Sequence, residues 1–121
     1  MLMKIAIIED DAAISQMYRI KFEAEGWTVE TAENGELGLK MVEDMKPDMV
    51  LLDLMMPVMN GDEMLEKLRA TSWGKNIKVI ILTNMGATEA PDKLKELGVE
   101  AFIVKAEMTP RQVAELVKSK I

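Results

Sequence analysis

Residues 49–57 read Met-Val-Leu-Leu-Asp-Leu-Met-Met-Pro, an apolar run that ends on a carboxylate. A short, unbroken apolar run of this kind is typical of a strand that is buried on both faces of a parallel sheet. Asp53 directly follows the run, and a carboxylate in such a place is costly to bury unless a partner offsets its charge. The stretch therefore predicts both a parallel sheet and a charged group at one edge of it.

Other segments with the composition of strands alternate with segments of helical periodicity. The predicted strands cover residues 5–8, 28–32, 49–52, 79–82 and 101–104. The predicted helices cover about residues 12–24, 35–45, 62–70 and 89–97, and a last helix follows Thr109. Strands that alternate with helices form right-handed βαβ units, so we expect a doubly wound α/β domain with helices on both faces of the sheet.

Capping residues and apolar spacing predict how each helix begins and which face it buries. Asp11 is a suitable N-cap, and Thr109, Pro110 and Gln112 have the spacing of a capping box. Apolar residues at helical spacing are expected to face the core. In chain order these are Ala13, Ile14, Met17, Ile20 and Ala24; Leu37, Met41, Val42 and Met45; Met64, Leu65 and Leu68; and Val113, Leu116 and Val117.

Composition excludes several classes of chemistry. The chain has 121 residues, 15 Lys plus Arg against 21 Asp plus Glu, and neither cysteine nor histidine, so it offers no disulfide, thiol nucleophile, Cys/His zinc site or histidine base. A net charge of −6 disfavours nucleic acids and anionic membranes as partners. No apolar stretch is long enough for a membrane helix, and the N-terminus does not resemble a signal peptide. We expect one cytoplasmic domain over residues 1–121.

Polar residues follow four of the predicted strands, where open parallel sheets bind their ligands. They are Glu9, Asp10 and Asp11, then Asp53, then Thr83, then Lys105. Two carboxylates about 6 Å apart repel each other by roughly 3 kcal/mol at an effective dielectric constant of 20, and one lysine cannot offset three acids. Mg²⁺ would suit these oxygen ligands, and a carboxylate beside Mg²⁺, a lysine and a hydroxyl can accept a phosphoryl group. The alternative is a structural salt bridge between Asp53 and Lys105.

This arrangement resembles the receiver domain of two-component response regulators over essentially the whole chain. The segments that carry the resemblance are Ile7–Asp11, Leu51–Pro57, Asn60-Gly61, Leu82-Thr83 and Val104-Lys105. The resemblance implies a flavodoxin-like sheet with strand order 2-1-3-4-5, the order that such receivers share.

The resemblance also implies a role for each acidic residue. Asp53 would be the phosphoacceptor. The Mg²⁺ ligands would be Asp10, Asp53 and the backbone carbonyl of Met55, with Glu9 acting through a metal-bound water. Asp11 does not fall on a ligand position, which agrees with its expected role as a helix cap.

Three further residues match functional positions of the family, and two of them, Thr83 and Phe102, match its switch positions. Thr83 would donate its hydroxyl to the phosphoryl group, and Lys105 would form an ion pair with that group. Phe102 stands where the family has its rotating aromatic residue. Movement of Thr83 and Phe102 would reshape the face formed by the helix near 89–97, the strand at 101–104 and the last helix, which is also where a homodimer would form.

The implied function is a phosphorelay signalling switch. A sensor histidine kinase or a phosphotransfer protein would supply the phosphoryl group from a phosphohistidine, a downstream protein would read the result, and hydrolysis of the acyl phosphate would reset it. The domain would catalyse its own phosphorylation and dephosphorylation without being an enzyme that turns over substrates.

The sequence departs from the family pattern at a few positions. Ala106 replaces the usual proline after Lys105, and a cis bond before a residue other than proline costs about 3 kcal/mol, so we expect a trans peptide there. Asn84 replaces a small residue and would narrow access to the phosphoryl site. Met55 and Met85 cannot orient a water molecule, which predicts slow self-dephosphorylation.

Three other readings remain to be tested against this one. The first is a pseudo-receiver that is not phosphorylated and acts only as an interaction module. The second is a phosphatase of the haloacid dehalogenase type, which the Glu9-Asp10-Asp11 run disfavours because such enzymes need Asp-x-Asp. The third is a flavodoxin-like flavin binder, which the acidic first loop and the missing glycine-rich phosphate loop disfavour.

Overall fold

The computed structural model describes residues 3–84 and 92–121. A five-stranded parallel sheet has the order β2-β1-β3-β4-β5. The strands are β1 (Lys4–Ile8), β2 (Thr28–Ala32), β3 (Met49–Leu52), β4 (Val79–Thr83) and β5 (Ala101–Val104). The helices are α1 (Ala12–Ala24), α2 (Gly35–Met45), α3 (Gly61–Arg69), α4 (Lys93–Glu96), the 3₁₀ turn η2 (Lys105–Glu107) and α5 (Pro110–Lys120). The predicted fold class and strand order are confirmed.

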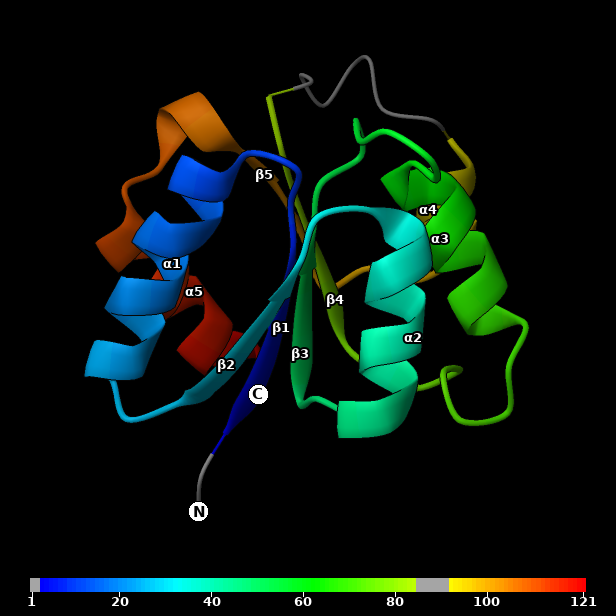
Figure 1. The fold of residues 1–121 in the computed structure, drawn as a ribbon, viewed down its shortest axis with the longest axis horizontal. Helices are drawn as coiled ribbons and strands as arrows, with labels where there is room; N and C mark the ends of the chain where they lie inside the picture. Colours follow the sequence, from blue (N-terminus) through cyan, green and yellow to red (C-terminus); the bar gives the residue numbers. More distant parts are fainter. Residues whose placement is uncertain (1–2, 85–91) are drawn as a thin grey trace.

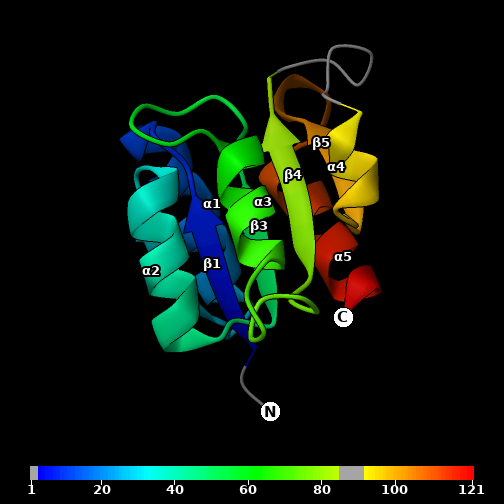
Figure 2. The same ribbon diagram turned by 90° about the vertical axis from the view of Figure 1, so that its right-hand side faces the viewer.

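Helices cover both faces of the sheet, as Figure 1 shows, with α1 and α5 on one side and α2, α3 and α4 on the other. The side view in Figure 2 has the same layers. A separate hydrophobic core lies on each face of the sheet. Successive side chains of β1 pack into one core and then the other, because neighbouring side chains of a strand point to opposite faces. Ile5 and Ile7 pack with Phe22 and Val113 beneath α1 and α5, whereas Ile8 packs on the α2 and α3 side.

Helix α1 buries a different face from the one that its apolar spacing predicted. Ser15, Tyr18 and Phe22 point inward, whereas Met17 and Ile20 are 43% and 60% exposed. Ala13 and Ala24 are exposed too, and Ile14 is half-buried. The prediction was wrong because this helix has apolar residues on two faces, and the larger aromatic side chains gain more by burial.

The remaining helices agree better with their sequence patterns. Met64, Leu65 and Leu68 of α3 are fully buried, and so are Val113 and Val117 of α5. Two differences remain. Leu37 of α2 is 47% exposed instead of buried. Of the predicted helix at 89–97, residues 89–91 lie outside the described ranges; in the described remainder α4 covers only Lys93–Glu96, and Asp92 and Leu97 are turns.

The predicted caps are present at both ends of the chain. The Asp11 carboxylate accepts hydrogen bonds from the N–H groups of Ala13 and Ile14 at 2.9 and 3.0 Å. Thr109 and Gln112 form both hydrogen bonds of the capping box that starts α5. These caps place the loops that carry the polar residues, since each fixes the first turn after a strand end.

The loop between β3 and α3 is held tightly at Gly61. A Cβ atom built on Gly61 would lie 2.0 Å from the carbonyl oxygen of Asp53, so only glycine fits. The N–H of Gly61 also donates to the carbonyl of Leu54 at 2.9 Å. In the same loop Val58 has a φ of +68°, a conformation that branched side chains rarely adopt. The close contact at Gly61 and the unusual backbone conformation at Val58 therefore both constrain the loop that follows Asp53.

Arg69, the last residue of α3, joins separate parts of the chain. Its guanidinium donates to the carbonyls of Leu97 and Gly98 after α4, each at 2.7 Å. It also donates to the carbonyls of Gly74 and Ile77 before β4, at 2.8 and 2.7 Å. Burial lowers the pKa of Arg69, while the charge of Glu100 opposes that shift. Arg69 thus fastens the end of α4 to the body of the domain.

In the part of the chain that the structure describes, none of the helices has both the length and the apolar character to span a lipid bilayer.

Candidate functional site

The polar residues singled out in the sequence meet at the carboxyl edge of the sheet. Glu9 follows β1, Asp53 follows β3 and Lys105 follows β5, while Thr83 is the last residue of β4. Parallel strands in register place these ends side by side; Thr83, for example, pairs with Val104. The edge lies at the top of Figure 1, where the loops leading into α1 and α3 also run.

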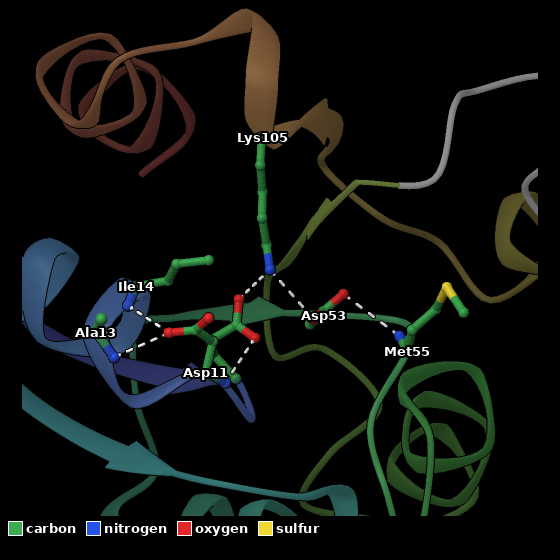
Figure 3. A network of polar contacts seen from close by, with 7 residues as sticks. Asp11, Ala13, Ile14, Asp53, Met55 and Lys105 are labelled. Atoms are coloured by element: carbon green, nitrogen blue, oxygen red, sulfur yellow. Dashed lines mark hydrogen bonds and ion pairs between the residues drawn. The ribbon is translucent and has the colours of Figure 1, made fainter.

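Lys105 lies between two buried carboxylates. Its Nζ atom lies 3.1 Å from Oδ2 of Asp53 and forms a second, shorter ion pair with Oε1 of Glu9. Asp53 is only 6% exposed and Glu9 only 5%. Figure 3 shows Lys105 reaching from η2 across the edge toward Asp53. One ammonium group thus contacts both acids, whereas the simplest sequence reading paired it with Asp53 alone.

Backbone donors hold the other carboxylate oxygens. The N–H of Met55 donates to Oδ1 of Asp53 at 3.3 Å, and the N–H of Asp11 donates to Oε2 of Glu9 at 3.2 Å. Both contacts appear in Figure 3. Hydrogen bonds from N–H groups stabilise a carboxylate in its charged form. The two acids are therefore fixed in orientation as well as in place.

A small cavity of about 220 Å³ opens onto this cluster. Its lining residues are Glu9, Asp10, Asp11, Ile14, Asp53, Met55, Thr83, Asn84 and Lys105. Thr83 is 1% exposed, so its side chain is almost entirely enclosed by protein. Four carboxylates, one ammonium group and one threonine hydroxyl line the cavity, so it is suited to a cation and would accept an anionic group only beside one.

Burial and charge change the titration of the cluster. Burial raises the pKa of Glu9 to about 7, the hydrogen bond from Lys105 opposes that shift, and the charge of Asp53 adds to it. For Lys105 burial acts to lower the pKa, but the hydrogen bond to Glu9 and the charge of Asp53 outweigh it and the pKa is raised. The ammonium therefore stays charged, and Glu9 keeps its proton to a higher pH than an ordinary glutamate does.

Glu9, Asp10 and Asp53 fit a divalent cation. Each offers one carboxylate oxygen, and these oxygens lie within 4.8 Å of one another. Oxygen donors alone are the ligands that Mg²⁺ prefers, and it usually keeps several waters. Asp10 is exposed, so a hydrated ion has access from solvent, while Glu9 and Asp53 form the buried side. The three carboxylates of the predicted metal site thus lie together, and the predicted part of the Met55 carbonyl stays a prediction.

Other residues predicted from the sequence lie around this centre. Phe102 is half-buried on β5 and packs on the α2–α3 side of the sheet. Met55 is exposed at the rim, and the Lys105–Ala106 peptide is trans, as predicted. Met85 lies outside the described residues.

The sequence analysis did not identify Tyr18, which is buried on α1 and interacts electrostatically with Lys105 and Glu9. Burial raises the pKa of Tyr18, the charge of Lys105 acts to lower it, and the charge of Glu9 raises it. Its ring centroid lies 5.9 Å from that of Phe22, which in turn lies 5.3 Å from that of Trp27. The spacing of these aromatic residues along α1 was the available signal, since Tyr18 and Phe22 are one helical turn apart.

Comparison with solved structures defines the class of the protein. The chemotaxis protein CheY4 of Vibrio cholerae superposes with a TM-score of 0.91 over the full length of both chains, at 26% identity. A CheY-like receiver domain protein of Methanospirillum hungatei JF-1 gives a TM-score of 0.90 at 32% identity, over 99% of this chain and 94% of that one. The fold is that of a CheY-like receiver.

The sequence comparisons agree with the structural ones. Residues 5–118 match the response regulator receiver domain family, and the chain belongs to that family. The phosphate regulon transcriptional regulatory protein PhoB of Rhizobium meliloti is 33% identical over 118 residues, which is 96% of this chain and 51% of that protein. The chain spans about half the length of the curated relatives it matches. Membership of the family means that the domain takes part in signalling by phosphorylation.

Proposed function

We propose that Asp53 accepts a phosphoryl group from a phosphohistidine on a sensor histidine kinase or phosphotransfer protein. An Asp53 carboxylate oxygen attacks phosphorus, the N–P bond breaks, and the histidine imidazole leaves. The single observation that carries this proposal is the buried Asp53 carboxylate, which is in contact with Lys105 and opens onto the 220 Å³ cavity. A small acyl phosphate such as acetyl phosphate would react in the same way.

Four residues would hold Mg²⁺ for this reaction. They are Asp10, Asp53 and the Met55 carbonyl as direct ligands, with Glu9 acting through water. When bound, the ion neutralises negative charge on the phosphoryl group during transfer. Lys105 would leave Glu9 in part and pair with the phosphoryl oxygens, since its ammonium already lies 3.1 Å from the acceptor carboxylate.

The exposed apolar face of α1 supports docking of a helical phosphodonor. Met17 and Ile20 lie one turn apart on this helix, and α1 begins two residues after Asp10. A donor helix that packs along α1 would bring its phosphohistidine to the acid edge. Ile20→Glu should therefore slow loading from a phosphohistidine protein far more than loading from acetyl phosphate.

The response to phosphorylation would run through Thr83 and Phe102. Thr83 lines the cavity, and Phe102 lies on the neighbouring strand, where it pairs with Ile81. A phosphoryl group that draws Thr83 inward would allow Phe102 to turn and reshape the face of α4, β5 and α5. That face would bind a downstream protein or a second copy of the domain.

We further propose that the domain is a cytoplasmic signalling protein and not an enzyme with free substrates. Hydrolysis of the acyl phosphate resets it, and the apolar Met55 beside Asp53 makes that hydrolysis slow. Replacing Met55 by Asn should shorten the lifetime of the acyl phosphate.

The decisive experiment is intact-mass measurement after incubation with Mg²⁺ and acetyl phosphate. The wild type should gain one phosphoryl group and Asp53→Asn none. Asp11→Asn is the matched control, because asparagine also caps helices and Asp11 is the neighbouring acid that should not react. Absence of an adduct on the wild type would favour the pseudo-receiver, and continuous turnover of phosphodonors would favour the phosphatase.

A further inference from the structure

The methionine side chains that the structure describes differ widely in exposure. Met55 is 63% exposed and Met17 is 43% exposed, whereas Met49 and Met64 are fully buried. The others that can be compared are half-buried. Oxidation of a thioether by dissolved peroxide depends on its access to solvent. Met55 is thus the described methionine most open to such a reagent.

Met55 is also part of the phosphoryl site. It lines the 220 Å³ cavity together with Asp53 and Thr83, and its N–H donates to Oδ1 of Asp53 at 3.3 Å. It lines a second, adjoining cavity of about 560 Å³, to which Asp10 also contributes. Figure 3 shows its side chain rising from the loop beside Asp53, with the sulfur between two carbon atoms near its end. A chemical change at this sulfur therefore occurs at the mouth of the site.

We propose that Met55 is a redox modification site whose oxidation by hydrogen peroxide shortens the lifetime of the acyl phosphate on Asp53. The proposal rests on the function proposed above. The sulfur lone pair attacks one peroxide oxygen and forms an S–O bond, the O–O bond breaks, and the second oxygen departs as hydroxide. The proton on the transferred oxygen passes to that hydroxide, which leaves as water. Sulfur loses two electrons, peroxide is reduced, and the product is the sulfoxide.

The physical basis is the change in hydrogen bonding at the mouth of the site. A thioether is a weak acceptor, so Met55 holds no water in a fixed place. A sulfoxide is polar and accepts hydrogen bonds through its oxygen. That oxygen can orient a water molecule toward the phosphorus of the acyl phosphate. One added hydrogen bond to the attacking water is expected to raise the hydrolysis rate by about fivefold.

Neighbouring methionines in the same loop provide a comparison within the molecule. Met56 and Met59 are half-buried and pack against the core on the α2–α3 side. They should react more slowly than Met55 with the same reagent. Methionine sulfoxide reductases restore the thioether, so the effect on Asp53 should be reversible.

The test uses the full chain, treated with hydrogen peroxide, quenched, and then loaded with Mg²⁺ and acetyl phosphate. Peptide mass spectrometry locates the sulfoxide, and intact mass follows decay of the adduct after the donor is removed. Treated wild type should lose its phosphoryl group about five times faster than untreated protein. Treatment with both sulfoxide reductases should reverse this change. Met55→Leu should show no response to peroxide, and Met17→Leu, which lacks the other exposed thioether among the described residues, should keep the response.

Three results would overturn the inference. These are equal decay rates after complete oxidation of Met55, an acceleration that persists in Met55→Leu, and oxidation at Met17 that spares Met55. Failure of untreated protein to form an adduct is a different result, because it overturns the proposed function and this inference with it. The untreated sample therefore distinguishes the two failures.

Discussion

The two edges of the same sheet differ in how deeply their charged side chains are buried. At the carboxyl edge Glu9, Asp53 and Lys105 have side chains that are 10% exposed or less. At the amino edge Lys4 and Asp48 are exposed, and the Lys4 N–H donates to Asp48 Oδ2 at 2.8 Å in contact with water. The sheet can therefore form without burying charge. Because buried charged side chains gather at the carboxyl edge and not at the amino edge, we identify the carboxyl edge as the functional one.

Removing the buried cation should have the largest effect on stability. Lys105→Met leaves Glu9 and Asp53 facing each other without a counter-charge, so we expect the free energy of unfolding to fall by about 3 kcal/mol at pH 8 without metal. Urea unfolding measures it. Lys105→Arg keeps the charge and should lose less; an equal loss in the two variants would mean that packing, not charge, is responsible.

Removing one buried acid should have the opposite sign. Asp53→Asn leaves one Glu9–Lys105 pair, and we expect the metal-free protein to gain about 1 kcal/mol in urea unfolding, because one repulsive contact is lost. Mg²⁺ should stabilise the wild type and have little effect on this variant. A wild type that Mg²⁺ does not stabilise would contradict the predicted metal site.

The protonation of Glu9 predicts how stability depends on pH. Its native pKa is about 7, against 4.5 for the ordinary group, so between these values the folded protein holds a proton that the unfolded chain releases. Stability from Glu9 is therefore present below pH 4.5 and is lost as pH rises through 7. The difference in unfolding free energy between wild type and Glu9→Gln, measured at pH 5 to 8 without metal, should show this decline. Mg²⁺ affinity should rise over the same range, because the ion competes with the proton.

Backbone strain at the two edges can be compared through a pair of glycine substitutions. Val58, with φ +68°, lies near the carboxyl edge, and Lys46, with φ +47°, ends α2 at the other. We expect Val58→Gly to raise the free energy of unfolding by about 1 kcal/mol and Lys46→Gly by less, because a branched side chain tolerates this conformation worse. Thermal unfolding of both variants checks the order; a larger gain at Lys46 would contradict it.

The smallest change is expected at the solvated edge. Asp48→Asn should alter the free energy of unfolding by less than about 0.5 kcal/mol, because an exposed amide can still accept the Lys4 hydrogen bond. Measured beside Asp53→Asn with and without Mg²⁺, it serves as the matched control. A metal response at Asp48 would remove the distinction between the two edges.

Much of the fold was predictable because unbroken runs of apolar residues indicate strands that are buried on both faces. Val50 and Ile80 lie in unbroken apolar runs that only a sheet covered on both faces can bury. The face of α1 was not predictable in the same way. Met17 and Ile20 have the spacing of a core face, but Tyr18 and Phe22 occupy the core, and choosing between two apolar faces requires the shape of the neighbouring β strands and α5.

The sequence predicted which residues form the candidate site, but it did not predict which of their side chains contact one another. Asp53 and Lys105 follow strands, and the ends of parallel strands converge whatever the details of packing. That Lys105 contacts Glu9 as well as Asp53 depends on where η2 directs its side chain. The raised pKa of Glu9 depends on the depth of burial, which no spacing in the sequence encodes.

Arg69 has a consequence for the way the domain opens and closes in solution. Helix α4 (Lys93–Glu96) has four residues, and a helix of this length does not persist by itself in water. The Arg69 guanidinium donates both to the carbonyls of Leu97 and Gly98 and to those of Gly74 and Ile77, so displacement of Arg69 removes the donor from both groups at once. We therefore expect the end of α4, the end of α3 and the approach to β4 to lose their protection from hydrogen exchange together.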